Sequence, residues 1–185
     1  MKNLFITLII LFTYACKAQS PIISTVDWEN DNNGNIELTQ GCYLKDVENK
    51  FAPFLGTWKW VDGNSILEIQ FEKIEMVYNG DYYEDILVGK YRFVDSNGSE
   101  KHNSLNVNLN NQNVSGYSYY LIRGSGYDTD FTKLFRITDL KKNAHCNLEF
   151  TLLSPTQAEW KIWRYDGKKQ PSGFTFPEVL TLTKQ

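Results

Sequence analysis

Apolar and polar side chains alternate along much of the chain after residue 54, and this pattern restricts the fold more than any other feature. Between residues 67 and 72, Leu67, Ile69 and Phe71 alternate with charged or amide side chains. A period of two predicts a strand that buries one face and exposes the other. The period breaks between Phe71 and Ile74, which predicts a β-bulge or bend at that point.

Short β-prone segments of this kind recur up to the end of the chain, separated by turn residues such as Gly, Asn, Asp and Pro. The predicted strands are 55–61, 67–78, 85–94, 105–110, 117–122, 131–137, 146–153, 158–165 and 178–184, with a loop at 123–130. No window carries a helical stripe of useful length. The sequence therefore predicts an all-β fold. We expect a single antiparallel meander β-barrel of about 8–10 strands, lipocalin-like, with a two-sheet β-sandwich as the alternative.

The first eighteen residues have the features of an export signal. Lys2 provides a basic start, residues 4–14 form an unbroken apolar run, and small residues follow at Ala15, Cys16 and Ala18. The run is too short to span a bilayer as a mature helix. We expect a signal peptide at 1–18, an extended N-terminal lead-in at 19–50 and a β-barrel domain at 51–185. The protein is then exported to the periplasm, the outer membrane or the cell exterior.

Two cleavage positions are open, and they differ in how the protein is anchored. Cleavage after Ala18 releases a free chain, whereas cleavage before Cys16 leaves a lipid-modified cysteine that holds the protein to a membrane leaflet. Thr13 stands three residues before Cys16, where a lipoprotein signal prefers Leu, and this favours the free chain. A lipid anchor at Cys16 is the only membrane attachment that we expect.

Cys42 and Cys146 are the two cysteines that follow the predicted signal. In an oxidising compartment two cysteines most simply form a disulfide. A bridge that closes a loop of about 100 residues would stabilise the fold by up to about 4.7 kcal/mol in the chain-entropy model. The alternative is a pair of buried free thiols.

Charge and aromatic content narrow the range of partners. The formal net charge is −3 and no run is rich in lysine or arginine, so nucleic acid has no electrostatic binding site. Aromatic residues make up 15% of the chain. This content is typical of a β protein with a large aromatic interior or with an amphipathic binding surface.

Gly56 and Trp58 form a Gly-x-Trp motif at the start of the first predicted strand. The motif resembles that of lipocalins and related calycin barrels, in which the Trp closes one end of the barrel and a basic residue of the last strand packs across its ring. The resemblance implies structural roles for Gly56 and Trp58. It also implies a cation over the Trp ring, from Lys184 or Arg164, worth about 0.5–2 kcal/mol.

A wider set of motifs covers nearly the whole mature chain. The motifs are Tyr43-Leu44-Lys45-Asp46, Asn49-Lys50-Phe51, Pro53–Trp60, Tyr82–Asp85 and Leu182–Gln185, together with Ala18-Gln19-Ser20 at the end of the signal. On these residues the chain resembles a family of uncharacterised exported proteins of Bacteroidetes that carry a domain of unknown function. The resemblance implies an exported barrel-like domain and implies no activity.

The sequence contains no recognised catalytic motif. His145 lies beside Cys146, but adjacent residues of a strand point to opposite faces, so the two side chains should not meet. Asp128 and Asp130 lack the glycine and the later glutamate of a calcium loop. We therefore expect a protein that is not an enzyme and that has no catalytic residue, cofactor or metal.

The segment Asp81–Asp85 combines three carboxylates with Tyr82 and Tyr83. Tyrosines offer broad contact at a low cost in conformational entropy, so this segment is a candidate for stacking on a sugar or a peptide. The alternative is an exposed turn that covers one end of the barrel.

The predicted function follows from the barrel interior, because a barrel of about eight strands can hold one small ligand. Alternation assigns inward positions to Trp60, Leu67, Ile69, Phe71, Leu87, Tyr91, Phe93, Val107 and Trp160. The candidate ligand contacts among them are Trp60, Phe71, Tyr91, Phe93 and Trp160. We predict an exported, non-enzymatic barrel that binds a small apolar ligand. The alternative is a solid-cored envelope protein whose loops contact another envelope protein.

Overall fold

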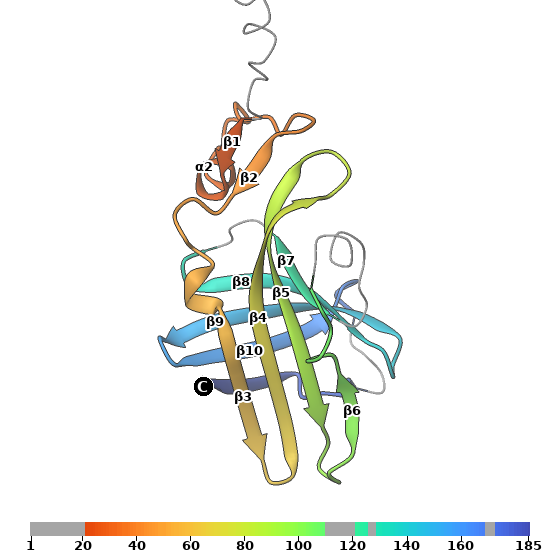
Figure 1. The fold of residues 1–185 in the computed structure, drawn as a ribbon. Coiled ribbons are helices and arrows are strands. Elements are labelled where there is room, and N and C mark those ends of the chain that lie inside the picture. Colours follow the sequence, from red (N-terminus) through yellow and green to blue (C-terminus); the bar gives the residue numbers. More distant parts are fainter. Residues whose placement is uncertain (1–20, 110–120, 126–128, 169–172) are drawn as a thin grey trace, which may run out of the picture.

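Eight antiparallel strands close into a β-barrel in the structure, a computed structural model that describes residues 21–109, 121–125, 129–168 and 173–185. The barrel strands are β3 (Gly56–Asp62), β4 (Ser65–Tyr78), β5 (Tyr83–Val94), β7 (Ile122–Ser125), β8 (Thr132–Asp139), β9 (Ala144–Ser154), β10 (Gln157–Arg164) and β11 (Val179–Lys184). Their order around the wall follows the chain (Figure 1). The sequence-based prediction of an all-β antiparallel meander barrel is therefore confirmed.

Two contacts between strands distant in sequence close the barrel. The last strand, β11, pairs with the first, β3, through Thr183 opposite Lys59 and Lys184 opposite Trp58. Strand β5 pairs with β4 along its length and with β7 near its middle, where Gly89 lies opposite Ile122. Closure removes the free sheet edges that a flat meander would expose. The short strand β6 (Glu100–Asn103) pairs with the far end of β5 outside this circuit.

Residues 21–50, which we call the N-terminal unit, extend the sheet beyond one end of the barrel (Figure 1). The unit contains β1 (Ile22–Ser24), the short helix α2 (Thr25–Glu29) and β2 (Tyr43–Lys45). Strand β1 pairs with β2, and β2 pairs with the start of β5, both in parallel. A single 3₁₀ turn, η1 (Ala52–Phe54), then leads into β3. The polar lead-in expected here is thus partly built into the sheet.

The β-bulge of strand β4 lies later than the sequence indicated. Pairing with β5 continues from Phe71 through Ile74, and the register shifts between Ile74 and Val77. Met76 takes the left-handed conformation there, with φ of 57°. The alternation of the strand continues past Phe71, but the next residue on the inward face is the charged Lys73. Its ammonium group lies near the buried carboxylates of Asp46 and Asp85, so a charged residue occupies a position where the pattern predicts an apolar one.

One hydrophobic core fills the barrel. Its largest fully buried side chains include Trp58, Trp160, Tyr91, Phe71 and Phe150. A second, smaller cluster lies on the opposite face of the β4–β5 hairpin. It consists of Val77, Ile86, Val88 and Leu121, with Ile74 and Leu109 packed against it.

Two predicted strands are wrong or displaced. Residues 105–109 form no strand, because a turn follows β6, in which the Val107 N–H donates to the Ser104 carbonyl at 2.9 Å. The Ser104 N–H donates to the Tyr91 carbonyl, and its hydroxyl exchanges hydrogen bonds with the Tyr91 backbone. The apolar Leu109 packs against the second, smaller cluster, although it belongs to no strand. Of the strand predicted at 117–122, only 121–122 lie within the described residues. Strand β7 begins at Ile122 and continues through residues predicted as loop.

The predicted disulfide between Cys42 and Cys146 is not formed, and both residues are buried free thiols. Cys42 precedes β2 in the N-terminal unit, where its carbonyl accepts from the Tyr83 N–H. Cys146 lies on β9 and faces the barrel core. The two cysteines thus lie in different parts of the fold, Cys42 in the N-terminal unit and Cys146 in the barrel core. The predicted signal, with Cys16, lies outside the described residues.

We predict that Gly89→Ala destabilises the fold by about 1–3 kcal/mol, the usual cost of overpacking a core. An added Cβ would lie 2.8 Å from the Phe71 ring and 3.0 Å from the Ile122 Cβ. Urea unfolding of the variant measures this effect. Thr181→Ala, at an exposed position of β11, is the control and should change stability by less than about 0.5 kcal/mol. Equal stability of the two variants would contradict the close packing.

Candidate functional site

The structure places four of the five candidate ligand contacts in the barrel core. Phe71, Tyr91, Phe93 and Trp160 are buried there, and Trp60 is half-buried and packs against the same core. Val107, another of the nine inward assignments, is half-buried, belongs to no strand and is not part of this core. The five candidate ligand contacts therefore come together in one interior.

Aromatic rings occupy the interior in direct contact with one another. Phe71 stacks on Phe135 with ring centroids 4.9 Å apart, and Phe150 meets Phe71 edge-on at 5.1 Å. Phe150 also meets Trp58 edge-on at 5.2 Å. Such contacts match the spacing of aromatic pairs in ordinary protein cores. The described side chains thus fill the part of the barrel where an apolar ligand would have to lie.

Two wall glycines let these rings approach the backbone. Gly89 is the cross-strand partner of Phe71, and a Cβ at Gly124 would lie 2.7 Å from the Phe135 ring. A ring folded over a glycine of the neighbouring strand covers backbone that would otherwise be bare. The rings of Phe71 and Phe135 therefore lie directly against the backbone of the wall at these two positions.

Trp58 closes one end of the barrel. Its indole N–H donates to the Phe54 carbonyl at 2.8 Å. Lys184 Nζ lies 5.1 Å from the Trp58 ring centroid and donates to the Pro53 carbonyl at 2.8 Å. Partial burial lowers the pKa of Lys184. Of the two cations that the Gly-x-Trp resemblance allowed, Lys184 makes the contact.

Arg164, the other cation considered, forms an ion pair with Asp166 at 2.8 Å. Gly56 has φ of 103°, a conformation that side chains rarely adopt. A Cβ at this position would lie 3.5 Å from the Lys184 Cε. Position 56 therefore requires glycine for its backbone conformation more than for its small size.

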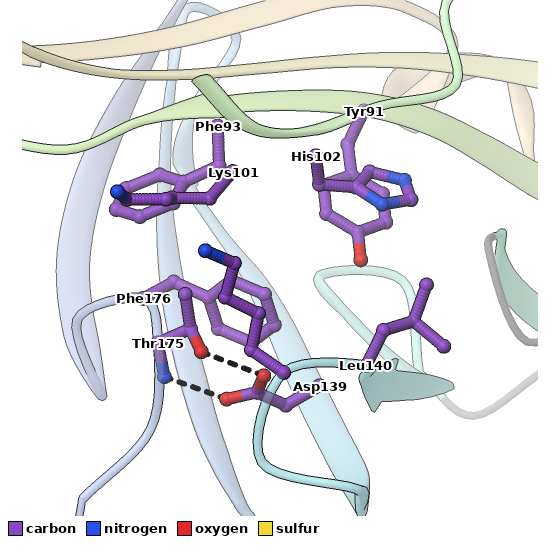
Figure 2. A pocket seen from close by; sticks show the side chains of 9 residues that line it. Tyr91, Phe93, Lys101, His102, Asp139, Leu140, Thr175 and Phe176 are labelled. Carbon is purple, nitrogen blue, oxygen red and sulfur yellow. Dashed lines mark hydrogen bonds between the residues drawn. The ribbon is translucent and has the colours of Figure 1, made fainter. Parts of the chain in front are cut away.

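A small cavity lies at the far end of the barrel, between Tyr91, Phe93, His102 and Phe176 (Figure 2). Its volume is about 20 Å³, enough for one buried water molecule. The Tyr91 ring stacks on His102 with centroids 4.0 Å apart, and burial raises the pKa of its hydroxyl. Asp139 at the rim accepts hydrogen bonds from the Thr175 N–H and hydroxyl.

A buried ionic network joins the N-terminal unit to the barrel. Asp85 Oδ1 accepts from the Tyr43 hydroxyl at 2.5 Å, and Asp85 Oδ2 lies 3.1 Å from Lys73 Nζ. Asp46 lies 3.6 Å from the same ammonium group and accepts from the Lys50 and Phe51 N–H groups. Burial by itself lowers the pKa of Lys73, but its hydrogen bond to Asp85 and the nearby carboxylates outweigh burial and raise it.

The acidic-aromatic segment Asp81–Asp85 is therefore divided between two roles. Asp85 is fully buried in the network, and Glu84 is buried beside Arg123, whose guanidinium donates to it at 3.2 Å. Burial raises the pKa of Glu84, an effect that Arg123 offsets in part. These two carboxylates hold the fold and do not face a ligand. Tyr82 and Tyr83 remain half-exposed, so the aromatic half of the segment is available for contact.

The remaining titratable candidates do not form a reactive pair. His145 is exposed and its Nδ1 lies 3.2 Å from the Thr138 hydroxyl, whereas Cys146 is buried on the opposite face. Burial raises the pKa of the Cys146 thiol to about 11, so the thiol is protonated at neutral pH. Asp130 pairs with Lys50 at 2.6 Å, and Asp128 lies outside the described residues.

Sequence reasoning missed two tyrosines that the fold brings beside Tyr83. Tyr43 lies opposite Tyr83 on β2, and Tyr78 lies opposite it on β4. The three residues are separated by up to forty positions in the chain. Only the pairing of β2 with β5, which no local pattern indicates, could have revealed the group.

Within the described residues, no group of three or more His, Cys, Asp or Glu side chains is arranged to hold a metal ion. No helix in the same part of the chain is long and apolar enough to cross a membrane.

We predict that Lys73→Met destabilises the fold by about 3 kcal/mol at neutral pH, because it leaves two buried carboxylates without their cation. The pKa of Lys73 is raised in the folded state, so its stabilising effect is complete below the unfolded pKa of about 10.4 and is lost as pH rises further. Urea unfolding of both proteins at pH 7 to 11.5 should show the difference shrink above pH 10.4. The exposed-site variant Lys161→Met is the control. A difference that stays constant up to pH 11.5 would contradict this assignment.

Lys184→Ala should also destabilise the protein, by about 1–3 kcal/mol, through loss of the cation–π contact and of a hydrogen bond to a backbone carbonyl. The measurement is thermal unfolding followed by tryptophan fluorescence. Lys161→Ala, on the exposed face of β10, should have little effect. If both alanine variants melt together, Lys184 has no structural role at the closed end.

Comparison with curated proteins and with solved structures gave no significant match. One protein family does match, over residues 1–185, and its description is "Family of unknown function (DUF6705)". With its packed eight-stranded barrel and its N-terminal unit, the chain belongs to this family of unknown function.

Proposed function

We propose that the protein is an exported, non-enzymatic β-barrel protein of the cell envelope that acts through its outer surface and binds no ligand inside the barrel. The observation that carries this proposal is the filled interior. Phe71, Phe135 and Phe150 occupy the centre in mutual contact, and the wall beside them is glycine. The solid-cored alternative raised by the sequence is thus better supported than the ligand-binding barrel.

Volume is the quantitative reason for this preference. Pockets for small molecules in proteins usually measure about 300–1,000 Å³. The cavity beside Tyr91 measures about 20 Å³, which suits a water molecule. A fatty acid or a similar apolar ligand would have to displace several buried rings, at a cost comparable to large core substitutions.

The state of the titratable groups supports a role without catalysis. Nucleophilic or acid–base work needs a reactive group that meets a partner within hydrogen-bond reach. Cys146 is a protonated thiol in the core and His145 faces solvent on the other side of β9. Asp85 and Glu84 are already engaged by Lys73 and Arg123.

Export is supported by the basic start, the apolar run and the small residues of 1–18. Strand β1, the first element of the chain, lies in the N-terminal unit beyond one end of the barrel (Figure 1). Cleavage after Ala18 would release the chain a few residues before β1, and a lipid anchor at Cys16 would attach it to a leaflet from the same end. Mass measurement of the mature amino terminus separates these two forms.

The central test is uptake of a fluorescent fatty acid. We expect its emission to stay unchanged on addition of the mature protein, and native mass spectrometry of gently purified protein to show the mass of the polypeptide alone. A fatty-acid-binding barrel of known capacity serves as the positive control. A saturable rise in emission with one probe bound per chain would overturn the proposal, because it requires a hollow interior.

A further inference from the structure

The strands of the N-terminal unit and of the β4–β5 hairpin place four large side chains in one row. Ile22 is the cross-strand partner of Tyr43, Tyr43 of Tyr83, and Tyr83 of Tyr78. Directly paired residues of a sheet point to the same face. These four residues, which we call the tyrosine row, therefore cross β1, β2, β5 and β4 on a single face, at the end of the molecule remote from the barrel (Figure 1).

The row is open to solvent. Ile22 is 60% exposed and Tyr78 is 42% exposed, while Tyr43 and Tyr83 between them are half-buried. The rings of Tyr78 and Tyr83 lie 5.1 Å apart. Lys45 Nζ lies 5.7 Å from the centre of the Tyr43 ring, so one ring of the row already makes a cation–π contact within the chain.

The row is also rigid, because the opposite face of the same strands is buried. Leu44 and Val77 are buried there. The Tyr43 hydroxyl is held by Asp85, and the Tyr78 hydroxyl donates to the Gly80 carbonyl. A partner would therefore meet side chains whose conformations are already restricted, which lowers the entropic cost of binding.

The charge around the row is strongly negative. Residues 21–50 contain six acidic and two basic side chains, whereas the whole chain has a net charge of only −3. Asp27 and Asp81 are exposed. Glu75 on β4 is 64% exposed and lies 3.5 Å from Lys73 Nζ, so its charge is balanced in part. Such a field repels anionic lipid and nucleic acid and attracts cationic groups.

We propose that the tyrosine row is the docking surface for a lysine- or arginine-bearing segment of a partner protein. This inference rests on the proposed function, since it names the surface through which a solid barrel would act. Tyrosine rings receive the cationic side chains by cation–π contact, and the surrounding carboxylates supply charge complementarity. Four strands span about 14 Å, the length of about four extended residues, so a short linear segment matches the row.

The test uses fluorescein-labelled octapeptides in which valine alternates with lysine, glutamate or serine, measured by fluorescence anisotropy at several salt concentrations. We expect the lysine peptide to bind, and to bind less tightly as salt increases, while the other two peptides do not bind. Tyr78→Ala should weaken binding of the lysine peptide at least fivefold, and Tyr78→Phe should restore most of it because the ring is retained.

Matched controls separate the row from the general negative charge of the protein. Tyr165 is an exposed tyrosine at the end of β10, and Tyr165→Ala should leave peptide affinity unchanged. Ile22→Lys places a cation on the row and should abolish binding, whereas Val179→Lys adds the same charge at an exposed site of β11 and should have a small effect. These surface changes leave the core intact, and circular dichroism checks the fold.

Three results would overturn the inference. The first is equal affinity of the lysine peptide for the wild type, Tyr78→Ala and Ile22→Lys. The second is tighter binding of the glutamate or serine peptide, and the third is preference for anionic phosphatidylglycerol vesicles or a neutral cello-oligosaccharide. The fatty-acid probe is measured on the same samples. If peptide docking fails while the probe stays silent, only this inference is lost, whereas uptake of the probe overturns the proposed function itself.

Discussion

Packing of aromatic rings against bare backbone is the constraint on which this barrel depends. Phe71 covers its cross-strand partner Gly89, Phe135 lies against Gly124, and the two rings stack on each other. The rings from β4 and β8 thus meet over the two paired strands, β5 and β7, that carry these glycines. The same packing that stabilises the closed barrel places described side chains in the space that lipocalin-like barrels use for ligands.

The second determinant is the charge network at the bulge of β4. The left-handed conformation at Met76 turns its N–H toward Asp85, which also binds Tyr43 and Lys73. These contacts join the bulge, β2 and β5 in one place. A buried ion pair adds little net stability relative to an apolar core, but removing one of its partners leaves a buried charge unpaired. The register that creates the tyrosine row is therefore linked to this network.

Much of the fold could be predicted because alternation is a local property. The strands from Gly56 to Val94 and from Thr132 to Lys184 lie close to the predicted ranges. The prediction failed at residues 105–109, where Leu109 packs on the second, smaller cluster without strand pairing. It also failed for the disulfide, because cysteine number and compartment contain no information on the distance between Cys42 and Cys146.

The sequence by itself determined the class of fold and every assigned interior position except Val107, since both follow from the order of neighbouring residues. The structural use of Gly56 and Trp58 was implied by the resemblance of their motif to that of lipocalins. Tertiary structure alone decided whether the interior is hollow and which surface residues stand together. Both properties depend on which strands become neighbours. That choice is made by packing and charge pairing between segments far apart in the chain, such as Tyr43 with Tyr83 and Lys73 with Asp46.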